Sequence, residues 1–112
     1  MNKDNFDLKK ELNFAFSCIQ NNNYQEAVKI YEQILQKNYD SFEANSNLGM
    51  LFAQQDNLNK AEKYLNNAIT IDPNNPHALN NLASVLIRLG RNEESIKYSE
   101  EAIKINKNFS SA

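Results

Sequence analysis

The sequence predicts an all-α fold, a solenoid of three helix–turn–helix hairpins with about six antiparallel helices. Two observations lead to this prediction. Apolar residues recur at helical spacing along the chain, and no stretch alternates apolar and polar residues as a strand requires. The helical pattern also returns at a fixed interval, from position 14 to 48 to 82 for example, and an interval of this size is typical of repeat architectures.

The second helix of each hairpin carries one apolar face with i, i+3, i+4, i+7 and i+8 spacing. This face consists of Ala27, Ile30, Tyr31, Ile34 and Leu35, and one repeat period later of Ala61, Tyr64, Leu65, Ala68 and Ile69. It continues at Tyr98, Ala102 and Ile103, with Ser95 and Ser99 in place of two apolar members. Such a face predicts a helix that packs against a core on one side.

The first helix of each hairpin follows the same period. Phe14, Leu48 and Leu82 lie one period apart, and each is followed by a small residue, Ala15, Gly49 and Ala83. A small side chain is needed where two helices cross closely, because a bulky one would force the axes apart. The short polar segments QNNN, QQDN and RLGR separate the two helices of each hairpin and suit turns between antiparallel neighbours.

The segment IDPNNPHALNNL, residues 71–82, forms the boundary between two hairpins. Pro73 cannot continue a helix, so Ile71-Asp72-Pro73 closes one unit. Asn75 or the amide before it can cap the next helix, and Pro76 suits its first turn. The sequence therefore predicts a corner here and not a ligand cluster.

The length of the period, together with Leu48-Gly49, Phe52, Ala61, Ala68 and Asp72-Pro73, resembles the tetratricopeptide repeat. The resemblance implies a right-handed solenoid. It divides the chain into a lead-in at 1–7 and repeats at 8–41, 42–75 and 76–109, with 110–112 as the start of a truncated or absent further helix. The second repeat fits best, and the first lacks the Gly and Pro markers while keeping the core positions.

Charge and composition disfavour several classes of partner. The net charge is −2, so no basic face is expected to neutralise nucleic-acid phosphates. The longest apolar runs are only a few residues, far short of a membrane span. The first residues, MNKDNFDLKKEL, lack the apolar region of a signal peptide, which leads us to expect a cytoplasmic protein.

The residue types needed for catalysis are sparse, and we expect no enzyme, no cofactor and no metal site. The only histidine, His77, is expected near the start of a helix, and Cys18 occupies a core position like a small apolar residue. Asp72 and His77 are two candidate ligands where a metal site needs about four. The two glycines, Gly49 and Gly90, do not form a phosphate-binding loop.

The family resemblance implies a concave groove lined by the first helix of each repeat, which binds an extended peptide or a partner helix of another protein. Asn13, Asn47 and Asn81 share one inner position of the three repeats and resemble the asparagine ladder of related arrays in O-linked sugar transferases. An amide can pair with both polar groups of a peptide backbone. The other inner residues that we single out are Phe16, Met50, Gln54, Ile87 and Arg88.

Three alternatives stay open. Asparagine accounts for 20 of the 112 residues, so the ladder is also explained by composition. The carboxylate clamp of chaperone-binding relatives maps to Leu12, Phe16, Asn47, His77 and Asn81, and only Asn47 matches it, which disfavours the tails of heat-shock chaperones. The uncapped end around Ile96, Tyr98, Ile103 and Ile105 suggests a self-assembling scaffold as a second function. A further alternative is a non-catalytic segment of a larger multi-repeat protein or secretion chaperone.

Overall fold

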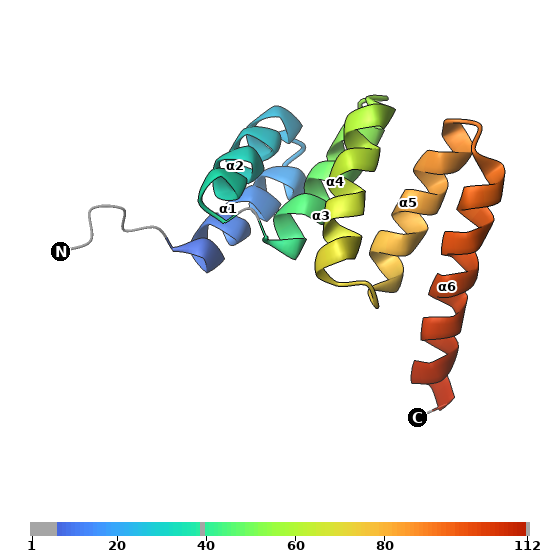
Figure 1. The fold of residues 1–112 in the computed structure, drawn as a ribbon. Helices are drawn as coiled ribbons and strands as arrows, with labels where there is room; N and C mark the ends of the chain where they lie inside the picture. The colour runs from blue at the N-terminus through green and yellow to red at the C-terminus, as the bar shows by residue number, and fades with distance from the viewer. Residues whose placement is uncertain (1–6, 39, 112) are drawn as a thin grey trace.

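The structure consists of three antiparallel helical hairpins that stack side by side (Figure 1). This computed structural model describes residues 7–38 and 40–111, with side chains as far as Lys107. The hairpins are α1 (Leu8–Gln20) with α2 (Tyr24–Lys37), α3 (Phe42–Gln54) with α4 (Leu58–Ile71), and α5 (Pro76–Arg88) with α6 (Asn92–Ser111). No strand occurs in these described ranges, and the prediction of an all-α hairpin repeat is confirmed.

The first helix of each hairpin begins at a side-chain cap, and the three caps hold equivalent positions of the repeat. The Asp7 carboxylate accepts a hydrogen bond from the Lys10 amide, and the Ser41 hydroxyl oxygen accepts one from the Ala44 amide. The Asn75 side chain accepts from the amides of residues 77 and 78, which confirms the predicted corner. Each cap satisfies backbone donors that the first helical turn leaves unpaired.

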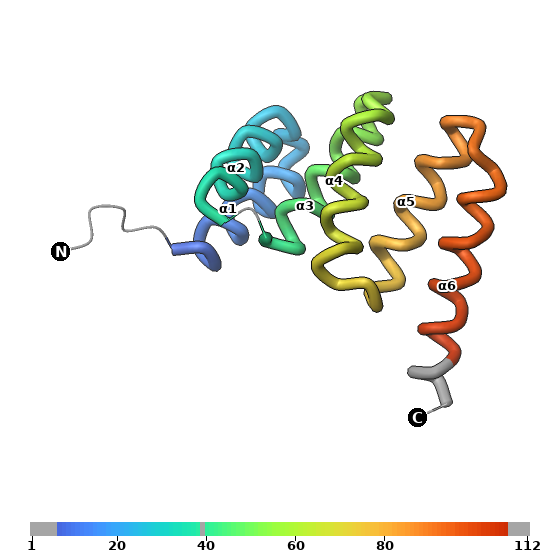
Figure 2. Tube along the Cα trace, in the orientation of Figure 1, coloured from blue at the N-terminus to red at the C-terminus, as the bar shows by residue number. Residues whose placement is uncertain are grey.

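The turn inside each hairpin repeats one backbone conformation. Asn22, Asp56 and Gly90 have φ of 63°, 67° and 82°, and they too hold equivalent positions of the repeat. Left-handed backbone favours glycine and tolerates Asn and Asp, which are the three residue types found here. The shared conformation lets each hairpin reverse within the same short turn. Figure 2 shows the three hairpins following one another along the molecule.

Equivalent positions become buried where one hairpin packs on the preceding one. Leu48 is 0% exposed and Leu82 is 1% exposed, whereas Phe14 at the same position of the first hairpin is 55% exposed. α3 packs on α2 and α5 packs on α4, but no described hairpin lies on the corresponding side of α1. The difference in burial therefore comes from the neighbour and not from the residue type.

The second hairpin has a very close approach between its two helices. A Cβ atom on Gly49 would lie 2.5 Å from Cγ of Leu65, 2.9 Å from its Cδ2 and 3.3 Å from the carbonyl oxygen of Ala61. These distances confirm that a small residue is needed at this crossing. Alanine holds the equivalent positions 15 and 83, where both side chains are buried.

The last helix is longer than the others. α6 has 20 residues, and in Figure 1 its end extends beyond α5. Positions 110 and 111, where we expected a further helix to begin, continue α6. Ala112 and residues 1–6 of the lead-in lie outside the described residues. Within the part of the chain that is described, no helix is both long and apolar enough to span a membrane.

Candidate functional site

The three asparagines of the predicted ladder lie on α1, α3 and α5, but their surroundings differ. Asn13 is exposed, while Asn47 and Asn81 are half-buried. The Asn47 side chain donates a hydrogen bond from Nδ2 to the Tyr31 hydroxyl oxygen at 2.9 Å. Tyr31 belongs to α2, so this bond joins the first hairpin to the second. The middle rung is therefore also a structural contact between hairpins.

The Tyr31 side chain is 0% exposed. Burial raises the pKa of its phenol to about 12, because the charged form would lose its hydration. The hydrogen bond from Asn47 lowers that pKa, and the nearby Glu43 carboxylate raises it. The phenol is consequently neutral at physiological pH and serves as a fixed acceptor for Asn47.

Tyr31 should make the folded chain sensitive to alkali. A phenol titrates near 10 in the unfolded chain and near 12 when folded, so the folded state holds the proton more tightly across this range. The contribution of the protonated Tyr31 phenol to the free energy of unfolding is therefore complete below pH 10. It is lost as the pH rises toward 12, by up to about 1.4 kcal/mol per pH unit. Tyr31→Phe should remove this loss while costing about 0.5–1.5 kcal/mol at pH 7. Urea unfolding of the parent and of Tyr31→Phe from pH 7 to 12 measures the fall in unfolding free energy with pH. An equal fall in both proteins would contradict the raised pKa of Tyr31.

The apolar members of the predicted groove include two exposed side chains. Phe16 on α1 is 47% exposed, and Ile87 on α5 is 56% exposed. Met50 on α3 is half-buried, and Gln54, the last residue of α3, is exposed. Exposed aromatic and aliphatic side chains of this size are suited to pack against apolar side chains of a partner.

Arg88 is engaged within the protein. Its Nη1 atom donates to the carbonyl oxygen of Ala53 at 3.0 Å, and its Nη2 atom forms an ion pair with Asp56. Both partners lie at the end of α3 or in the turn that follows it. The guanidinium therefore binds a carbonyl near the C-terminus of α3, where the helix dipole favours a cation. This contact joins the third hairpin to the second, and Gln54 holds the equivalent position in the second hairpin.

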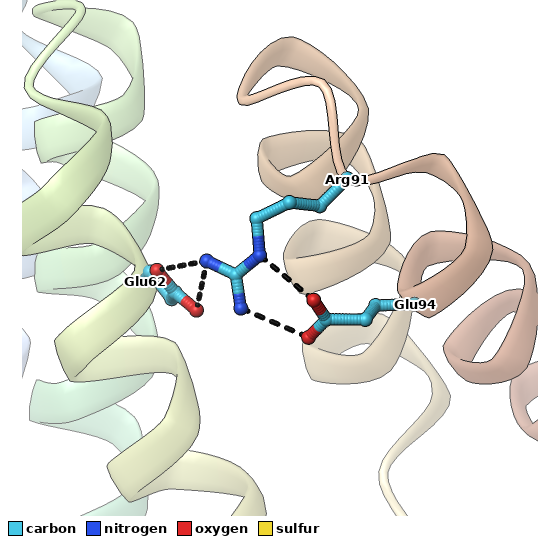
Figure 3. Close-up of polar contacts among 3 residues, drawn as sticks. All are labelled: Glu62, Arg91 and Glu94. Carbon is cyan, nitrogen blue, oxygen red and sulfur yellow. Dashed lines mark hydrogen bonds and ion pairs between the residues drawn. The ribbon is translucent and has the colours of Figure 1, made fainter.

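A second arginine strengthens the same junction (Figure 3). The Arg91 guanidinium bonds Glu62 of α4 at 2.8 Å through Nη1, and Glu94 of α6 at 2.9 Å through both Nε and Nη2. Pairing of Arg91 with Glu94 through two hydrogen bonds sets the orientation of the guanidinium as well as balancing its charge. The hydrogen bonds from Arg91 lower the pKa of the Glu94 carboxyl, and the two glutamates raise that of the arginine. This cluster could not be predicted from the sequence, because Glu62 and Arg91 lie far apart in the chain and come from different hairpins.

A cleft of about 420 Å³ lies away from the predicted groove. It is lined by Glu32, Leu35 and Gln36 of α2, Asn45 of α3, and Lys63, Tyr64 and Asn67 of α4. Asn45 is 1% exposed and donates from Nδ2 to the carbonyl oxygen of Ser41 at 2.9 Å. The third hairpin has Leu79 at the equivalent position. An amide at this position, where the first hairpin has Glu11, is the sequence feature that could have indicated the cleft.

The described side chains offer binding contacts and little reactive chemistry. Nowhere among them do three His, Cys, Asp or Glu side chains gather closely enough to hold a metal ion. Cys18 is 6% exposed, which agrees with its predicted place in the core. The groove residues accordingly remain candidates for recognition by hydrogen bonding and apolar contact.

Comparison with known proteins agrees with this architecture. Two family models described as tetratricopeptide repeat match residues 19–76 and 52–112. No curated protein matches the sequence.

Solved structures with the same fold have low sequence identity to this chain. A crystal structure of MamA has a TM-score of 0.86 at 16% identity, over 94% of this chain and 61% of MamA. The Yersinia enterocolitica type III secretion translocator chaperone SycD, in an alternative dimer, has a TM-score of 0.85 at 18% identity. The match covers 96% of this chain and 82% of SycD. The Thermobaculum terrenum O-GlcNAc transferase mutant K341M has a TM-score of 0.87 at 24% identity. The match covers 97% of this chain and 21% of the transferase chain. At these identities the likeness shows the fold alone, and the chain spans about three fifths of the length of MamA.

Proposed function

Because the chain belongs to the tetratricopeptide repeat family, we propose that it is a non-catalytic module that binds a segment of another protein. The segment is an extended peptide or a partner helix, and it lies across α1, α3 and α5. The observation that carries the proposal is the exposure of Phe16 and Ile87 at predicted inner positions of the first and third hairpins. Apolar side chains of a bound segment would bury both of them, and burial of such area favours association.

The asparagines provide the polar part of the recognition. Among the described residues, no hydrogen bond engages the side chain of Asn13 or Asn81, so each offers a donor and an acceptor to a peptide backbone. Asn47 uses one N–H on Tyr31 and keeps its Oδ1 atom and its second N–H. The bond to Tyr31 holds this amide in one orientation, which lowers the entropy cost of using it.

The engaged arginine limits the kind of segment that is bound. Arg88 is paired with Asp56 and with the carbonyl oxygen of Ala53. An acidic peptide tail at Arg88 would have to share the guanidinium with the Asp56 carboxylate, which already offsets its charge. We therefore expect the groove to prefer segments with apolar side chains and backbone hydrogen bonds over segments recognised through a carboxylate.

Asn81→Ala should weaken peptide binding several-fold. A net hydrogen bond contributes about 0.5–1.5 kcal/mol, which corresponds to about 2–13-fold in the dissociation constant. The probe is a fluorescein-labelled peptide selected from a random peptide display library on the full chain, measured by fluorescence anisotropy. Asn81 tests the ladder more cleanly than Asn47, because replacing Asn47 also removes the bond to Tyr31.

The matched control for this measurement is Asn66→Ala. Asn66 is an exposed asparagine on α4, outside the predicted groove. It should leave the affinity unchanged, while Ile87→Glu should lower it more than Asn81→Ala. If selected peptides bind all four proteins equally, their site lies elsewhere and the proposal is wrong.

A further inference from the structure

The outer side of α6 carries an exposed apolar stripe. Ile96 is 56% exposed and Ile103 is 63% exposed, and their separation of two helical turns places both on one side of the helix. Tyr98 and Ile105, which we expected on the same surface, are half-buried, and Tyr98 packs against the core. Among the side chains of α6 that the structure describes, the exposed apolar surface is therefore narrower than expected and consists of these two isoleucines.

The repeat register shows what this stripe corresponds to in the other hairpins. Ile103 is equivalent to Leu35 of α2 and Ile69 of α4, and both of those are partly buried against the core. α2 is followed by α3 and α4 by α5, which pack on them. The chain thus buries the Ile103 position twice, and the outer face of α6 presents it a third time with no described hairpin on it. Ile96 corresponds to the partly buried Val28 of α2 and to Glu62 of α4.

The N-terminal side of the chain is a poor complement to this stripe. The faces of α3 and α5 that pack on the preceding hairpin have Ala44 and Ala78 at one position, both 0% exposed. The equivalent residue in α1 is the charged Lys10. A second position has Leu51 and Val85 in α3 and α5 but Ser17 in α1. Stacking α1 of another copy on α6 would bury a charged side chain in place of an alanine, which is costly unless the charge is paired.

We propose that α6 pairs with α6 of a second copy, as an antiparallel dimer about a two-fold axis near Ser99 and Glu100. This arrangement places Ile96 of each copy against Ile103 of the other. A two-fold interface joins the same surface on both subunits and closes at a dimer, whereas head-to-tail stacking would continue into filaments.

The charges along α6 favour the antiparallel direction. Residues 91–101 contain four glutamates, one arginine and one lysine, a net charge of −2, with Glu94 paired to Arg91. Residues 102–107 contain two lysines and no acidic residue. Antiparallel pairing brings Glu93 and Glu94 of each helix near Lys104 and Lys107 of the other and opposes like charges only at Glu100 beside the axis, while parallel pairing would oppose like charges along the whole helix. The helix dipoles also run in opposite directions in this arrangement.

Sedimentation velocity of the full chain over a range of concentrations tests the dimer. We expect a dissociation constant of about 10–500 µM, since two isoleucines per copy form less than a standard-size interface. Ile103→Glu and Ile96→Glu should each weaken the dimer at least about tenfold. Ile87→Glu is the matched control, because Ile87 is also 56% exposed and lies on α5, so it should leave the dimer intact.

The geometry is tested by disulfide crosslinking. Glu100→Cys lies near the proposed axis and should form a covalent dimer on oxidation, because the two Cα atoms would come within about 7 Å. Glu101→Cys removes the same charge but points away from the stripe, and it should crosslink much less. The native thiol of Cys18 is buried and does not compete.

Three results would overturn the proposal. The first is a monomer at about 1 mM, well above the expected dissociation constant. The second is a dimer that tolerates both glutamate substitutions. The third is association beyond a dimer, without crosslinking at position 100. None of these measurements depends on the peptide-binding groove. Loss of peptide binding in Ile87→Glu with an intact dimer would support both proposals separately.

Discussion

Leu48→Ala should lower the free energy of unfolding by about 2–5 kcal/mol. Leu48 is 0% exposed at the junction of the first two hairpins, so truncation removes buried apolar area and leaves a cavity. In a repeat protein the coupling between neighbouring units supplies much of the stability. We therefore expect the transition to become broader as well as less stable. Urea denaturation followed by circular dichroism at low micromolar concentration measures both changes.

The control for this prediction is Phe14→Ala. Phe14 occupies the same repeat position but is 55% exposed, so its truncation should cost about 0.5 kcal/mol or less although it removes a larger side chain. The pair separates the effect of position in the repeat from the effect of burial. Equal losses for the two variants would mean that the side chain of Phe14 is buried in solution.

Gly49→Ala should destabilise the chain by about 1–3 kcal/mol. In an exposed helix the same change stabilises by about 1 kcal/mol, because alanine has the higher helix propensity. Here the new methyl group would lie 2.5 Å from Cγ of Leu65, and Leu65 is 0% exposed. The buried leucine cannot move aside without disturbing its neighbours, so steric strain should outweigh the propensity gain. Equilibrium unfolding gives the sign directly.

A double-mutant cycle with Leu65→Ala assigns the strain to this contact. Leu65→Ala alone should cost about 2–5 kcal/mol, and adding Gly49→Ala to it should cost much less than in the parent chain. If the two effects are simply additive, the loss caused by Gly49→Ala comes from elsewhere, such as the carbonyl oxygen of Ala61 at 3.3 Å.

Most of the fold could be predicted from residue spacing. The repeat period placed the small residues at the helix crossings, and α1, α3 and α5 begin at Leu8, Phe42 and Pro76, where the expected units begin. This succeeds because helix periodicity and caps depend on neighbours within a few residues. The period also predicted equivalence between positions, but it could not predict that Phe14 is exposed while Leu48 is buried.

The candidate site was less predictable. The family register selected Asn47 and Arg88 as groove residues, and both contact another hairpin. Asn47 bonds Tyr31, and Arg88 bonds Asp56 and the carbonyl oxygen of Ala53. These partners are 16 to 35 residues away in sequence. The groove role of the predicted residues stays a prediction until a bound segment is measured.

The sequence by itself determined the helices, the hairpins and the family, because each rests on local spacing that recurs in every repeat. Only the tertiary structure decided which of the equivalent residues are buried, paired or free. The junction of the second and third hairpins has two arginine clusters, the junction of the first and second has the Asn47–Tyr31 bond, and α6 leaves Ile96 and Ile103 exposed. Hydrogen bonds and burial are settled by distances between hairpins, and those distances exist only once the chain has stacked.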